Sequence, residues 1–67
     1  MMDAVTKAVI ETIGGNGYRV EIGYTDALPV VVAIDEQTGE RFVVRGDDLY
    51  ETVCEVAAQV GIELDDG

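Results

Sequence analysis

The fold of this chain is decided by residues 18–34, which read YRVEIGYTDALPVVVAI. The first part alternates apolar and more polar side chains, the period-two pattern of a strand with one buried face. Its apolar positions are Tyr18, Val20, Ile22 and Tyr24. Residues 25–27 predict a turn, and residues 28–34 are apolar on both faces, as in the middle strand of a sheet. Two neighbouring antiparallel strands are therefore expected, with Pro29 at the entrance of the second.

A third strand is predicted over residues 41–45, with Phe42 and Val44 on one face. It follows a hairpin loop at residues 35–40, in which Gly39 is placed to take the left-handed conformation. Short connections favour a meander of three antiparallel strands with residues 28–34 in the centre.

A helix is predicted on each side of these strands. Asp3 can cap the first, and Val5, Val9 and Ile13 recur at four-residue intervals before a glycine-rich stop at residues 14–17. The second begins at Asp48, which forms a capping-box arrangement with Glu51. Its apolar stripe consists of Leu49, Val53, Val56, Ala57 and Val60. Gly61 ends the helix, and Ile62 supplies the apolar contact that often follows a glycine cap.

The predicted fold class is α+β, a single small domain over residues 1–67 with the order α-β-β-β-α. Both helices are expected to pack on one face of the sheet. The side chains assigned to that face are Tyr18, Val20, Ile22, Val30, Val32, Ile34, Phe42 and Val44. The other face is expected to carry Arg19, Glu21, Thr25, Val31, Ala33, Arg41, Val43 and Arg45.

Composition excludes several functional classes. The chain has 67 residues, with fourteen acids, four bases, one cysteine and no histidine, and a net charge of -10. Direct nucleic-acid binding is disfavoured because four cations cannot neutralise a track of phosphates. A disulfide framework or a Cys/His zinc site lacks the residues it needs. Cys54 has no histidine to activate it, so no catalysis is expected. No cofactor or metal is expected either. The absence of a long apolar segment and of a signal-peptide pattern predicts a cytoplasmic protein.

The acids form either a solvated face that keeps the chain soluble or a surface that binds a partner. Glu51 and Glu55 are one turn apart on the predicted second helix, about 6 Å along its axis, which is close to the repeat of phosphates along a nucleic-acid strand. The predicted partner-binding residues are Asp35, Glu36, Glu40, Asp47, Asp48, Glu51 and Glu55. Such a row can occupy a basic groove of a nucleic-acid-binding protein or nuclease. Double-stranded-RNA-binding domains share the order of elements, but they need lysines where this chain has Asp47 and Asp48.

The chain resembles small, acidic, phage-encoded anti-CRISPR proteins. The features that match are a helix before Tyr18, three strands ending at Arg45, and acids in the hairpin and last helix. That resemblance implies a non-enzymatic inhibitor that imitates DNA and blocks a nuclease.

An alternative hypothesis assigns the function to the uncovered face of the sheet. According to this hypothesis, an apolar strip bordered by arginines is formed by Val31, Ala33 and Val43. The chain would then be a structural or accessory module that homodimerises through this strip.

Overall fold

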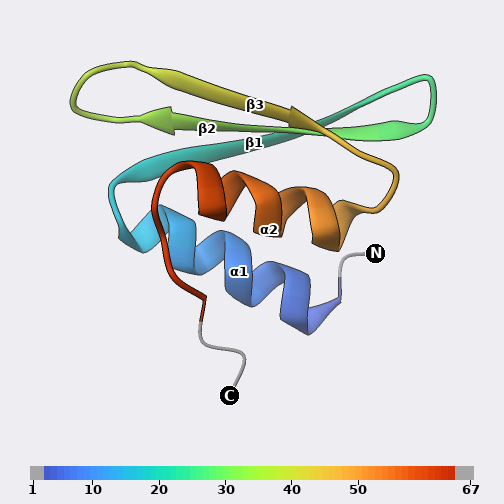
Figure 1. Cartoon of the computed structure of the whole chain (residues 1–67), viewed down its shortest axis with the longest axis horizontal. Helices are drawn as coiled ribbons and strands as arrows, with labels where there is room; N and C mark the ends of the chain where they lie inside the picture. The colour runs from blue at the N-terminus through green and yellow to red at the C-terminus, as the bar shows by residue number, and fades with distance from the viewer. Residues whose placement is uncertain (1–2, 65–67) are drawn as a thin grey trace.

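The order of elements is confirmed in the computed structural model, which describes residues 3–64 (Figure 1). The elements are α1 (Ala4–Gly15), β1 (Tyr18–Thr25), β2 (Leu28–Asp35), β3 (Arg41–Arg45) and α2 (Leu49–Gln59). The fold is α+β, as predicted. The predicted domain limits at residues 1 and 67 lie outside the described residues.

The strands form an antiparallel meander in the order β1-β2-β3, with β2 in the centre. Both helices lie under the same face: α1 packs on β1, and α2 packs on β2 and β3. Figure 1 shows the sheet above the helix layer, with the other face of the sheet uncovered by any described element. A two-layer architecture follows, in which one face of each layer meets the core.

The register of the sheet is set by a two-residue turn at Asp26 and Ala27. Thr25 pairs with Leu28, so Ile22 lies opposite Val31, and Val31 lies opposite Val44 on β3. Residues directly opposite each other in an antiparallel pair share a face. The core under the sheet accordingly consists of Val9, Ile13, Val31, Ala33, Val44, Val53, Val56 and Ala57.

The face assignment predicted for β2 is wrong. Val31 and Ala33 are 0% exposed and lie between the sheet and the helices, whereas Val30, Val32 and Ile34 lie on the uncovered face. The assignments for Tyr18, Val20, Ile22, Phe42 and Val44 are right, because these residues share the face of Val31 and Ala33. The error is a one-residue shift in register, which moves every side chain of a strand to the opposite face.

The predicted cap of α1 is confirmed. A carboxylate oxygen of Asp3 accepts the backbone N–H of Thr6 at 2.7 Å. The backbone N–H and the hydroxyl of Thr6 hold the pKa of Asp3 below its usual value. The buried stripe of α1 differs from the predicted one: Thr6, Val9 and Ile13 are buried and Val5 is 60% exposed. Side chains four residues apart point in directions that differ by about 40° around the helix axis. Val5 therefore points away from the buried side that Val9 and Ile13 share.

The predicted ends of α2 are also confirmed. Asp48 accepts the backbone N–H of Glu51 at 3.0 Å. At the other end Gly61 has a φ of 78°, and the N–H groups of Ile62 and Gly61 donate to the carbonyls of Ala57 and Ala58. This pair of bonds is the Schellman motif.

One aromatic residue does not pack where it was predicted to. Tyr24 is one of the apolar positions of the alternating pattern that predicts a buried face, but its side chain is 63% exposed. It faces the helix layer by register, opposite Pro29, near the end of the β1–β2 hairpin. Figure 1 shows this hairpin extending past the helices, so little of the helix layer is left to cover the ring.

The β1–β2 turn contains a position at which glycine is expected to increase stability. Ala27 has a φ of 66°, in the region where a Cβ costs roughly 1–2 kcal/mol. Ala27→Gly removes that cost but adds freedom to the unfolded chain, for a net gain of about 0.5–1 kcal/mol in the free energy of unfolding. Chemical denaturation measures the gain. Ala8→Gly, at an exposed position inside α1, is the control and is expected to lose about 1 kcal/mol. A loss of stability in Ala27→Gly would contradict the turn geometry.

Candidate protein-binding surfaces

Four of the predicted acids gather where β3 passes into α2. Asp47, Asp48, Glu51 and Glu55 line one hollow of about 330 Å³, together with Arg45. We call these four carboxylates the acidic corner. They converge because β3 ends at Arg45 and the chain turns at Gly46, so that the first two turns of α2 start beside the end of the strand. All four residues are exposed.

The acidic corner is partly a structural feature of α2. Asp48 is the N-cap and Glu51 lies in the first turn, where negative charge is favourable near the positive end of the helix dipole. Glu55 lies one turn further along the helix and has no such structural task in the cap. A surface with four carboxylates remains available to a cationic partner, with Arg45 at its border.

The other three predicted acids lie elsewhere. Asp35, Glu36 and Glu40 belong to the β2–β3 hairpin, at the opposite end of β3 from the acidic corner (Figure 1). Asp35 shapes the loop, because its side-chain oxygen accepts the N–H of Gln37 at 2.8 Å and that of Thr38 at 3.3 Å. The structure therefore divides the predicted partner-binding set into two groups rather than one row.

The uncovered face of the sheet, called here the open face, has an apolar centre with arginines on both sides. Read across the strands, its first row is Arg19, Ile34 and Arg41, and its second is Glu21, Val32 and Val43. The third row is Gly23, Val30 and Arg45, and the last is Thr25 and Leu28. An apolar stripe thus follows β2 from Leu28 to Ile34 and widens at Val43.

The apolar strip predicted for homodimerisation is corrected by this register. Val31 and Ala33 are in the core and are not available to a partner. Val43 is on the open face and 53% exposed, as expected, and Leu28 on the same face is 45% exposed. The stripe on the open face consists of Leu28, Val30, Val32, Ile34 and Val43. The sequence did not predict the full length of this stripe, because the length of the preceding turn determines which face of β2 is buried.

A hollow interrupts the open face beside the stripe. Gly23 lies opposite Val30, and the space left by its missing side chain is part of a depression of about 330 Å³. The depression is bordered by Glu21, Thr25, Val30 and Val32, among others. A Cβ built on Gly23 meets no atom within 4 Å. The depression therefore offers room for an apolar side chain brought by a partner.

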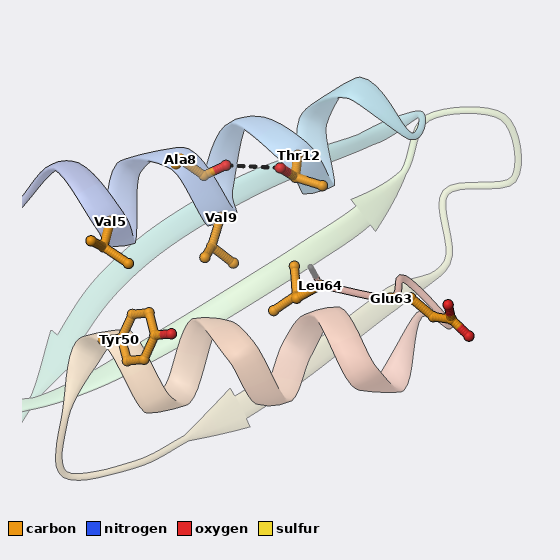
Figure 2. Close-up of a pocket in the computed structure, with 7 residues that line it drawn as sticks. All are labelled: Val5, Ala8, Val9, Thr12, Tyr50, Glu63 and Leu64. Carbon is orange, nitrogen blue, oxygen red and sulfur yellow. Dashed lines mark hydrogen bonds between the residues drawn. The ribbon is translucent and has the colours of Figure 1, made fainter. Parts of the chain in front are cut away.

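A third candidate surface lies between the two helices. Figure 2 shows Val5 and Val9 of α1 facing Tyr50 of α2 and Leu64 across a groove of about 520 Å³. Thr12 donates its hydroxyl to the carbonyl of Ala8 at 2.9 Å along one wall. The groove is mainly apolar, and its lining does not select one class of ligand.

Charge is separated between the open face and the rest of the chain. The open face holds Arg19, Arg41, Arg45 and Glu21, a net charge of +2. The remainder, with Lys7 and thirteen acids, carries -12. Arg19 and Glu21 form an ion pair at 3.4 Å, with both side chains more than half exposed. Such an exposed pair stabilises the fold little, so its charges remain available to a partner.

Comparison with known proteins gives no relative from which a function could be transferred. No protein-family model matches the chain, and no curated protein or solved structure matches it at a significant level. Within residues 3–64 no helix is long and apolar enough to cross a membrane. The same residues contain no group of three or more histidine, cysteine, aspartate or glutamate side chains that could hold a metal ion.

Proposed function

We propose that this chain is a non-enzymatic protein-binding module whose acidic corner occupies a basic, nucleic-acid-binding surface of a partner protein. The observation that carries the proposal is the convergence of Asp47, Asp48, Glu51 and Glu55 on one exposed hollow. Carboxylates at this density present the partner with a charge pattern like that of a phosphate strand, and their binding releases counterions from the basic surface.

The distribution of charge supports the proposal. Outside the open face the chain carries -12, which attracts a cationic surface over a distance set by salt screening. The domain measures 31 × 29 × 18 Å, which is large enough to cover a groove that would hold nucleic acid. The bound chain is therefore expected to block that groove sterically. These features support inhibition in which the chain occupies the nucleic-acid-binding surface of the partner and catalyses no reaction.

The experiment is affinity capture from a bacterial lysate on immobilised protein, with the retained proteins quantified by mass spectrometry. We expect a nucleic-acid-binding protein that is retained at low salt and released by duplex DNA or by increasing salt. Glu51→Lys/Glu55→Lys is expected to reduce its retention at least about tenfold, because attraction is replaced by repulsion at the centre of the contact.

Two matched variants complete the design. Glu11→Lys/Glu63→Lys changes the net charge by the same amount at exposed sites away from the corner and is expected to keep retention. Glu36→Lys/Glu40→Lys tests the hairpin acids. Retention that survives Glu51→Lys/Glu55→Lys, or that duplex DNA does not compete with, would overturn the proposal.

A further inference from the structure

The open face has dimensions that suit a helix. Its apolar stripe runs from Leu28 to Ile34, seven residues of β2 that span about 20 Å. A helix of about 14 residues has the same length. The opposite face of this sheet is already covered by helices in the same way, which shows that its twist accepts helical packing.

The chemistry of the open face defines its partner further. Arg19 flanks the stripe on the β1 side, and Arg41 and Arg45 flank it on the β3 side. An occupant with an apolar stripe and acidic flanks would bury Val32 and Val43 and place carboxylates beside these arginines. Arginine is well suited to this task because its planar group binds carboxylates with two hydrogen bonds.

We propose that the open face docks an acidic amphipathic helix of another protein, with one apolar side chain of that helix inserted into the hollow at Gly23. The inference does not use the four carboxylates of the acidic corner, although Arg45 borders both surfaces, and it assigns a second binding surface to the chain. The hollow supplies the specificity, since a buried anchor in a pocket contributes more to affinity than the flat contacts around it.

A second copy of the chain fits the open face less well. Two open faces stacked on each other would bring six arginines and two glutamates into one interface, a net charge of +4. Like charges brought together in this way weaken association. An acidic helix meets the +2 charge of a single open face without this repulsion, so charge complementarity at the interface favours it over the homodimer.

The test uses the intact protein and two synthetic 14-residue peptides held helical by a covalent staple. Both have leucines at i, i+3, i+4 and i+7; one has glutamates on the flanks and the other has lysines. Binding is followed by amide chemical shifts of the isotope-labelled protein. We expect the glutamate peptide to shift residues of the open face and to bind at least about tenfold more tightly than the lysine peptide.

Two variants separate the proposal from a structural effect. Gly23→Val fills the hollow from within, so we expect about tenfold weaker binding without loss of thermal stability, since valine favours a strand over glycine. Arg19→Glu/Arg41→Glu should reverse the preference so that the lysine peptide binds more tightly. Arg19→Lys/Arg41→Lys is the matched control and should retain the preference for the glutamate peptide.

Several outcomes would overturn the proposal. These are no saturable shifts at millimolar peptide, shifts confined to α1 and α2, or equal affinity for both peptides. A concentration-dependent dimer of the unmodified protein that Gly23→Val dissociates would overturn it in favour of a second copy.

Discussion

Val31→Lys is expected to abolish the folded state, whereas Val32→Lys is expected to leave the chain folded. Val31 is 0% exposed between the sheet and the helices, while its neighbour points to the open face. Burying an ammonium group without a partner costs several kcal/mol. A chain of this size has a total stability of only about 3–10 kcal/mol. On the open face the Val32 position lies beside Glu21, which a lysine can approach without leaving water.

Circular dichroism and amide chemical-shift dispersion distinguish the two outcomes. If Val31→Lys cannot be purified, chemical denaturation of the alanine variants gives the same comparison. Val31→Ala is expected to cost about 2 kcal/mol because it removes buried methyl groups and leaves a cavity. Val32→Ala is expected to cost less than about 1 kcal/mol. A folded Val31→Lys together with an unfolded Val32→Lys would show that the register is shifted by one residue.

The second large effect is expected at Gly46, where the chain leaves β3. A Cβ at this position would collide with the hydroxyl oxygen of Thr52 on α2. That hydroxyl cannot easily move, because it donates to the carbonyl of Asp48 at 2.6 Å and Thr52 is 3% exposed. Gly46→Ala is therefore expected to lose about 1–3 kcal/mol, as overpacked sites do, and to lower the melting temperature by at least about 4 °C.

A double-mutant cycle tests this cause. Thr52→Ala removes the obstructing oxygen, so Gly46→Ala should cost at least about 1 kcal/mol less in that background. Thr52→Val keeps an atom at the position of the hydroxyl oxygen and should give no such relief. An equal cost of Gly46→Ala in all three backgrounds would mean that the loss arises from the backbone and not from the contact with Thr52.

The sequence predicted the elements well because their signals are local. Asp3 and Asp48 cap helices within three residues of themselves, and Gly61 ends α2 through bonds to the preceding turn. Each of these features depends only on the chain next to it. The alternation in β1 was equally clear, since its polar residues mark the outward positions.

The face of β2 could not be predicted in the same way. Its residues are apolar on both sides, so they do not indicate which side is buried, and the assignment depended on the length of the turn. A three-residue turn at 25–27 pairs Ile22 with Val30, whereas the two-residue turn observed pairs it with Val31. Asp-Gly would have marked the two-residue turn, but the chain has Asp26-Ala27, with both residues at positive φ.

The candidate site was predicted in part for a related reason. Asp47, Asp48, Glu51 and Glu55 are close in sequence and stay close in space. Asp35, Glu36 and Glu40 are separated from them by the length of β3, which an antiparallel meander keeps extended. Composition reveals how many charges a chain has, but only the topology reveals which of them a single partner can touch.

The position of α1 has a consequence for how copies of this protein behave at high concentration. β1 is an edge strand eight residues long, the kind of edge on which sheets of separate molecules can join and grow. Strands that join in this way lie about 5 Å apart, whereas packed helices need about 8–10 Å between their axes. Because α2 occupies the space under β2 and β3, α1 is held under β1. Two copies that approached along β1 with their helix layers on the same side would collide through α1 before their strands could bond. The helix that completes the core therefore also opposes pairing of two copies through β1 in that orientation.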